Sequence, residues 1–307
     1  MRTAFINTLT KLAQKDKRIY LLTGDLGFSV FENFMKKFPN RFLNCGVAEQ
    51  NMMGVAAGLA LSGKKPYVYS IIPFVTVRCL EQIRNDICYQ NLDVKIVGVG
   101  GGFSYGVLGA THHAIEDLGI LRVLPNFTVL CPGDPIEVEQ LMLKSYLTKS
   151  PTYIRLNRSG EKIIHKLGDI VEIGKPFVLK KGKDGAVVVN GVFLGIGKEI
   201  VEKLAKMGYN LKLISLPTLK PVDKNFLFKE LKEYKLVFSL EEHNIMGGLG
   251  TVLAEVLMEK EWRGTLKRLA IPDQYFYRVG GAEYIRRRYR LSAEQLTDYI
   301  LKNFIKK

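Results

Sequence analysis

Short apolar runs alternate with longer helical patterns through the first half of the chain. Four runs, each bounded by turn residues, predict buried strands at 19–23, 67–72, 94–99 and 128–131. Between and after them, helices are predicted at 49–61, 75–89 and 135–146, the last with Pro135 in a first turn, where proline is tolerated. Strands that alternate with helices pair as a parallel sheet with right-handed crossovers. The chain is therefore expected to have an α/β fold.

The alternating pattern is interrupted once and then resumes. Residues 159–184 are rich in Gly, Lys and Asp and lack strong helical periodicity. Beyond them, strands are predicted at 186–189, 211–215 and 236–240, and helices at 197–207, 223–233 and 248–258. We expect two domains, 1–165 and 175–307, each with a mostly parallel sheet and helices on both faces.

Composition narrows the functional classes. With 47% hydrophobic and 24% charged residues, the 307-residue chain resembles an ordinary globular protein. Its apolar runs are too short to span a bilayer, and no secretory leader is expected. The four cysteines are scattered without metal-ligand spacing, which favours reduced thiols and a cytoplasmic location.

The net charge of +15 raises the question of nucleic acid. The basic residues are spread along the chain, and the densest run, at 286–290, has no recognised binding motif around it. A basic surface equally suits an acidic partner subunit or anionic substrates. We therefore expect neither nucleic acid nor a membrane among the partners.

The sequence contains none of the common short catalytic motifs, but five longer segments together indicate a family. The chain has no P-loop, no GxGxxG that opens a helix, no GxSxG and no HExxH. Five segments resemble those of transketolases and deoxyxylulose-phosphate synthases, in the order of that family and over essentially the whole chain. They are CGVAEQN (45–51), RCLEQIRND (78–86), THHAIED (111–117), CPGD (131–134) and EEHNIMGG (241–248).

This resemblance implies half of a larger enzyme. The two expected domains become a pyrimidine-binding domain and a transketolase C-terminal domain. The family's third domain holds the diphosphate of thiamine diphosphate through GDG, a later Asn and a divalent metal, and Gly24-Asp25-Leu26 is not that motif. A hard cation on a diphosphate needs such oxygen ligands. We therefore expect no metal site here, Mg²⁺ or Ca²⁺ on an N-terminal transketolase-like partner subunit, an α2β2 heterotetramer, and no activity without the partner.

The resemblance also assigns residues to the cofactor. Glu49 matches the glutamate that hydrogen-bonds N1′ of the aminopyrimidine, so that the ring can take the C2 proton of the thiazolium. The alternative is a structural acid favoured by the start of a helix. Phe74 matches an aromatic residue that stacks on the pyrimidine. Ile72 and Val77 would make the pocket aliphatic, and Asp25 matches an aspartate near the thiazolium.

A second group matches residues that contact the substrate. His112 matches the histidine that contacts the hydroxyl or carbonyl oxygen of the donor, whereas His113 stands where many relatives have glutamine. Two guanidinium groups and a hydroxyl suit a phosphate, and the positions that match phosphate-binding ones are Arg2, Ser29, Arg158 and, with less support, Arg155.

Two departures from the family concern substrate choice. Leu108 stands where the family has an aspartate that selects a substrate hydroxyl, and Gly100 replaces a phosphate-contacting histidine. We expect transfer of a two-carbon ketol unit from a ketose or ketose phosphate to an aldehyde, in specialised sugar metabolism. Two alternatives stay open at this point: the β subunit of a 2-oxo acid dehydrogenase, and a non-catalytic basic binding protein derived from the fold.

Overall fold

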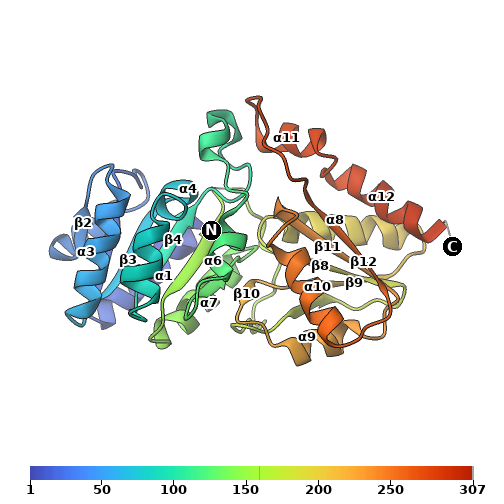
Figure 1. The fold of residues 1–307 in the computed structure, drawn as a ribbon, viewed down its shortest axis with the longest axis horizontal. Helices are drawn as coiled ribbons and strands as arrows, with labels where there is room; N and C mark the ends of the chain where they lie inside the picture. The colour runs from blue at the N-terminus through green and yellow to red at the C-terminus, as the bar shows by residue number, and fades with distance from the viewer. Residues whose placement is uncertain (159, 306–307) are drawn as a thin grey trace.

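The computed structural model describes residues 1–158 and 160–305. Ser159, in the predicted boundary segment, and residues 306–307, at the end of the second predicted domain, lie outside the described residues. Two α/β units lie side by side, the first from blue to green and the second from yellow to red in Figure 1. Each contains one sheet, as expected from the alternating sequence pattern.

The first sheet has seven strands in the order β10-β5-β6-β4-β3-β1-β2. All neighbours are parallel except β10, which runs antiparallel to β5. All five residues of β4 and of β6 are buried, as expected when helices cover both faces of a parallel sheet. The strands are β1 (Ile19–Thr23), β2 (Phe42–Asn44), β3 (Lys65–Ile71), β4 (Lys95–Val99), β5 (Thr128–Leu130), β6 (Thr152–Leu156) and β10 (Thr218–Lys220).

The second sheet has five strands in the order β12-β11-β8-β9-β7. Among the described strands of this sheet, only β7, at one edge, is antiparallel to its neighbour. The mostly parallel, two-unit α/β class predicted from the sequence is thereby confirmed. These strands are β7 (Phe177–Lys180), β8 (Gly185–Val189), β9 (Leu211–Ser215), β11 (Leu236–Asn244) and β12 (Thr265–Ile271).

Helices cover both faces of each sheet. In the first unit, α1, α2 and α7 pack on one face and α3 and α6 on the other. The second of these core layers continues into α9 and α10 of the second unit. The helices are α1 (Arg2–Lys15), α2 (Glu32–Lys37), α3 (Glu49–Leu61), α4 (Ile72–Val75), α5 (Leu80–Gln82), α6 (Asp117–Arg122), α7 (Pro135–Leu147), α8 (Phe193–Lys206), α9 (Lys224–Leu231), α10 (Leu249–Glu259), α11 (Ala282–Arg288) and α12 (Ala293–Ile305). None of these described helices is both long and apolar enough to cross a membrane.

The helix predicted over 75–89 is not continuous. It is divided into α4, α5 and a π-helical turn, η2 (Ile83–Cys88). The hydroxyl of Thr76 donates a hydrogen bond to the carbonyl of Ile72 at 2.6 Å. Such back-bonding to a carbonyl four residues earlier bends a helix. The prediction of one helix was therefore wrong, and the break places Arg78 in a turn.

The two units are joined by more than their linker. Strand β10 belongs to the second unit in sequence but extends the first sheet, and it lies between the units in Figure 1. Arg155 of β6 forms a buried ion pair with Asp117 at 2.9 Å and also donates to the carbonyl of Glu242 in β11 at 3.1 Å. These contacts fix one unit against the other. The domain bounds 1–165 and 175–307 stay a prediction.

Candidate active site

Glu49 begins α3, directly beyond the carboxyl end of β2. Its side chain is 1% exposed, yet both carboxylate oxygens have partners: Ser70 of β3 donates to Oε1 at 3.1 Å, and Arg78 donates to Oε2 at 2.8 Å. The helix N-terminus adds a favourable field for an acid. A Cβ atom at Gly24 would lie 3.3 Å from Oε1, so a glycine lets the end of β1 pass close to this carboxylate.

Phe74, on the short helix α4, contacts the same arginine as Glu49 does, Arg78. The guanidinium of Arg78 lies 4.3 Å from the centroid of the Phe74 ring. The ring of His112 contacts Phe74 edge-on, with centroids 5.1 Å apart and planes at 72°. Phe74 itself is half-buried. An aromatic ring, a buried acid and a histidine thus meet at one place, as the sequence assignment requires.

His112 is carried by the loop that follows β4. This loop contains two 3-10 turns, η3 (Gly106–Leu108) and η4 (Ala110–His112). Nδ1 of His112 lies 3.0 Å from Oγ1 of Thr111, and burial lowers the pKa of the imidazole. A neutral imidazole can accept or donate a hydrogen bond near pH 7. Leu108, on η3, is 52% exposed, so its side chain faces outward from this chain.

The loop after β1 carries Asp25 and Ser29, both with left-handed backbone conformations, at φ 56° and φ 62°. Asp25 is exposed and is held by Asn44, whose side chain accepts from its backbone N–H and donates to Oδ1, each at 3.0 Å. The backbone N–H of Ser29 donates to Glu32 at 2.5 Å. Residues held at positive φ cluster at functional sites, where the surrounding structure fixes them.

The two predicted phosphate arginines lie together. Nε of Arg2 donates to the backbone carbonyl of Arg158 at 2.7 Å, and the Arg158 guanidinium lies 5.2 Å from the Tyr105 ring centroid. Tyr105 in turn contacts His112, with ring centroids 6.4 Å apart. Arg155, ranked lower from the sequence, is 3% exposed and paired with Asp117, so it has no free face for a ligand in this chain.

The two aliphatic residues predicted to line the cofactor pocket differ. Ile72 is fully buried, and its side chain packs so closely on Gly98 that a Cβ atom there would lie 2.7 Å from Cγ1. Val77 is 47% exposed. In this chain, Val77 is therefore open to a ligand and Ile72 supports the strands behind the site.

Contacts connect most of the predicted residues into one site. They run from Glu49 through Arg78 to Phe74 and His112, and from there through Tyr105 to Arg158 and Arg2. The backbone N–H of Ser29 is bonded to Glu32 instead. Three further residues complete the connection: Ser70, Arg78 and Tyr105. Arg78 belongs to the RCLEQIRND segment, but the sequence patterns assigned it no role in the site. The feature that could have identified it is its position, because it is a basic residue four positions after Phe74, the aromatic residue predicted to stack on the pyrimidine.

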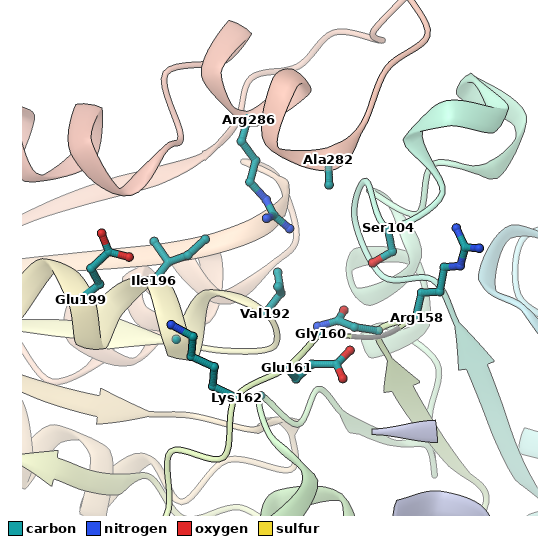
Figure 2. Close-up of a pocket in the computed structure, with 13 residues that line it drawn as sticks. Ser104, Arg158, Gly160, Glu161, Lys162, Val192, Ile196, Glu199, Ala282 and Arg286 are labelled. Atoms are coloured by element: carbon teal, nitrogen blue, oxygen red, sulfur yellow. The ribbon is translucent and has the colours of Figure 1, made fainter. Parts of the chain in front are cut away.

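A separate cavity of about 380 Å³ lies between the two units. Its lining includes Ser104, Arg158, Val192 and Arg286, but not Glu49, Phe74 or His112. In Figure 2, Arg286 points into the cavity from α11, whereas the guanidinium of Arg158 points away from its centre. Arg286 is occupied by an ion pair with Glu242 at 2.5 Å. Apart from Arg158, the site residues predicted from the sequence therefore lie outside this cavity.

The polar groups of the site do not form a metal centre. Among the described residues, no group of three or more His, Cys, Asp or Glu side chains is placed to hold a metal ion. The site offers instead a buried carboxylate and a half-buried aromatic ring, both in contact with Arg78. These groups fit the flat, nitrogen-bearing pyrimidine half of the cofactor predicted from the sequence.

A buried acid and an aromatic ring thus lie at the carboxyl edge of a parallel sheet, in a chain with a second α/β unit. Comparison with family models gives the class. Residues 1–161 match the transketolase pyrimidine-binding domain, and residues 174–296 match the transketolase C-terminal domain. The chain belongs to the transketolase family, which depends on thiamine diphosphate.

Several similar proteins are single subunits of divided enzymes. The chain is 37% identical over 268 residues to a subunit of the apulose-4-phosphate transketolase of Actinobacillus succinogenes, covering 87% of this chain and 86% of the relative. It is 32% identical over 297 residues to a 6-deoxy-6-sulfo-D-fructose transketolase subunit of a Clostridium species, covering 96% and 92%. A solved split-gene transketolase, an inactive β4 tetramer, has 35% identity and a TM-score of 0.88, covering 98% and 97%.

These comparisons confirm the family resemblance found in the sequence and the transketolase-type transferase class. They support neither alternative, the 2-oxo acid dehydrogenase subunit or the non-catalytic binding protein. The roles of the individual site residues stay predictions.

Proposed function

We propose that the chain is the pyrimidine-binding subunit of a two-subunit, thiamine-diphosphate-dependent transketolase. The observation that supports this most is the pairing of a buried Glu49 carboxylate and a half-buried Phe74 ring, both in contact with Arg78, at the carboxyl edge of the first sheet. Ligands of open α/β sheets bind at this edge. When bound, thiamine diphosphate supplies the electron sink for cleavage of a carbon–carbon bond.

The protein residues orient the cofactor and control a proton. Glu49 would hydrogen-bond the pyrimidine N1′ of the bound cofactor, and the hydroxyl of Ser70 would keep the carboxyl group in place for that contact. Phe74 offers its ring for stacking. Val77 closes the pocket with an aliphatic side chain, and the buried Ile72 packs behind the pocket. Asp25, held by Asn44, lies on the loop after β1, from which it would approach the thiazolium.

The substrate end is formed by His112 and the arginines beyond it. His112, neutral near pH 7, hydrogen-bonds an oxygen of the donor. Arg2, Ser29 and Arg158 bind a phosphate of the sugar, for which guanidinium groups are well suited. Leu108 presents an apolar wall where no hydroxyl finds a partner. Transketolase relatives named for apulose 4-phosphate and sulfofructose indicate that unusual sugars belong to this branch of the family.

A partner subunit completes the site. Loops that follow β1, β2, β3 and β4 expose large apolar side chains, and such surfaces mark protein interfaces: Phe28, Val47, Val77 and Leu108. We propose that an N-terminal transketolase-like subunit covers them, brings the diphosphate and Mg²⁺ or Ca²⁺, and forms an α2β2 heterotetramer in the cytoplasm. A relative was solved as an inactive β4 tetramer, and lack of activity is what we expect of this chain alone.

Reconstitution tests this proposal. The purified chain with thiamine diphosphate and Mg²⁺ should show no ketol transfer, whereas the chain with its partner should transfer a two-carbon unit from a ketose to an aldehyde. Turnover by the chain alone would contradict the proposed division of the site. Reduction of lipoamide by the complex would identify a 2-oxo acid dehydrogenase instead.

A substrate panel tests the role of Leu108. An apolar wall discriminates weakly, whereas a site built to hydrogen-bond a hydroxyl discriminates strongly. The complex should prefer sugars that are deoxygenated, branched or of opposite configuration at the carbon near Leu108. If xylulose 5-phosphate and ribose 5-phosphate give the highest kcat/KM, the enzyme is an ordinary transketolase in two pieces.

A further inference from the structure

Arg78 occupies the two surfaces that the proposed function gives to the pyrimidine ring. It donates to Oε2 of Glu49 at 2.8 Å and lies 4.3 Å from the centroid of Phe74. Oε1 of Glu49 is already taken by Ser70. In this structure, therefore, both carboxylate oxygens are engaged and a face of the ring is covered.

We call the Glu49 carboxylate and the Phe74 ring together the pyrimidine seat. A guanidinium resembles an aminopyrimidine in the features that these two surfaces recognise. Both are planar, both stack on aromatic rings, and both present N–H groups along an edge that meets a carboxylate. Another planar group can stack on that face of Phe74 only if Arg78 leaves it. Arg78 and the pyrimidine are thus alternative occupants of one seat.

The surroundings of Arg78 allow it to leave. Its side chain is 43% exposed, and it lies in the turn between α4 and α5 rather than within a helix. The Glu49 side chain, in contrast, is 1% exposed. A buried carboxylate without a partner is strongly destabilising, so the free subunit needs a cation at this place. An exposed side chain in a turn supplies that cation without being fixed there.

We infer that Arg78 is a placeholder that closes the pyrimidine seat of the free subunit and moves out when the cofactor binds. This inference rests on the proposed function. It makes Arg78 a competitor of the cofactor. The apparent affinity for the cofactor is then the intrinsic affinity multiplied by the fraction of molecules in which Arg78 has left the pyrimidine seat. Removal of the guanidinium should therefore strengthen cofactor binding, which is opposite to the effect of losing a residue that holds the cofactor.

The test measures the Kd of thiamine diphosphate with Mg²⁺ on the assembled two-subunit complex by titration calorimetry. Arg78→Met keeps the length of the side chain and removes its charge and N–H groups. We expect about three- to tenfold tighter binding than in the wild type, because the open fraction rises towards one. Arg84→Met, an exposed arginine on the following helical turn, is the matched control and should bind like the wild type.

A second measurement uses the free chain, so that it does not depend on assembly. Arg78→Met should lower the melting temperature, because Glu49 loses its cation, and the double variant Glu49→Gln/Arg78→Met should recover most of the loss. A structural arginine would lower the melting temperature without recovery in the double variant and without tighter cofactor binding.

The outcomes separate this inference from the proposed function. If the wild-type complex binds no thiamine diphosphate, the proposed function fails and this inference fails with it. If the wild type binds but Arg78→Met binds equally or more weakly, only the placeholder is overturned. Should Arg78→Met not assemble, Arg78→Lys retains a cation without the stacking plane. It should still bind more tightly than the wild type, and weaker binding would overturn the inference.

Discussion

Two buried glutamates lie in very different surroundings. Glu49 has partners from the first unit only, and one of them, Arg78, is 43% exposed. Glu137, on α7, accepts from Gly133 and from Ser215 of the second unit, each at 2.6 Å, and lies 3.4 Å from Nε2 of His165. The side chains of Glu137, Ser215 and His165 are all buried. The first acid faces an open edge of the sheet, and the second is enclosed between the units.

The protonation of the enclosed cluster follows from its surroundings. Burial raises the pKa of Glu137 to about 7. For Asp134, burial acts to raise the pKa, but hydrogen bonds from the His165 ring and from three backbone N–H groups lower it to about 2. Asp134 also caps α7 through the N–H of Glu137 at 2.9 Å. Burial of an acid therefore does not by itself mark an active site.

The largest effect is expected at Glu49 in the reconstituted enzyme. Glu49→Gln should lower kcat by about 10²–10⁴, the usual loss for a positioned acid–base group. Glu137→Gln, the matched enclosed acid, should retain the turnover of the wild type per folded complex. Steady-state ketol transfer measures both, and equal losses would remove the distinction between the two acids.

Stability should show the reverse pattern. Glu137→Ala should cost about 3–5 kcal/mol of unfolding free energy, because it breaks a buried cluster and leaves its partners unpaired. Glu49→Gln should change stability much less, since the solvent can hydrate the released Arg78. Urea unfolding of the free chain gives both values. A larger cost at Glu49 would show that its role is structural.

The phosphate end offers a similar contrast between an exposed and an enclosed arginine. Arg158→Ala should weaken a phosphorylated substrate by about 1.5–3 kcal/mol, the scale of hydrogen bonds to charged groups. An unphosphorylated analogue should be hardly affected. The KM values of the phosphorylated substrate and its unphosphorylated analogue, measured on the two-subunit complex of the wild type and of Arg158→Ala, test this prediction. Equal weakening of both would mean that Arg158 is structural, as Arg155 is.

The smallest effect concerns pH. A folded-state pKa of about 7 for Glu137, above its ordinary value of 4.5, means that the folded chain holds the proton more tightly than the unfolded chain. This stabilisation is present below pH 4.5 and is lost as the pH rises through 7. The pKa of His165 is also raised, by its hydrogen bond to Asp134 against the effect of burial, so its contribution is lost in the same direction.

The unfolding free energy of the free chain should therefore fall from about pH 5 to about pH 8, on the order of 1–3 kcal/mol. Glu137→Gln should flatten this slope, because it removes the group whose folded-state pKa is raised. A slope unchanged in Glu137→Gln would place the titrating group elsewhere.

Local patterns predicted much of the fold. The strands 19–23 and 211–215 and the helix 49–61 were predicted at their observed bounds, because apolar runs between breaking residues determine them. Helix α8 begins at Phe193, four residues before the predicted start, since Gly197 lies within it and lets it pack closely on Val189. Helices α1, α11 and α12 and the crossing strand β10 were not predicted, because their places depend on tertiary contacts.

The site was predicted less completely than the fold. Family resemblance pointed to Glu49, Phe74 and His112, which the structure brings together. The contact between Arg78 and Glu49 joins residues 29 apart in sequence, and no local pattern contains such a pair. The enclosed cluster of Asp134, Glu137 and His165 was missed for the same reason.

The most direct test of the account follows the proton that Glu49 is proposed to control. Exchange of the C2 proton of thiamine diphosphate for deuterium can be measured in the reconstituted complex without any substrate. The account predicts that Glu49→Gln slows this exchange by about 10²–10⁴ while cofactor and partner still bind, and that Glu137→Gln exchanges at the wild-type rate. Exchange near the wild-type rate in Glu49→Gln would contradict the account and remove Glu49 from the mechanism.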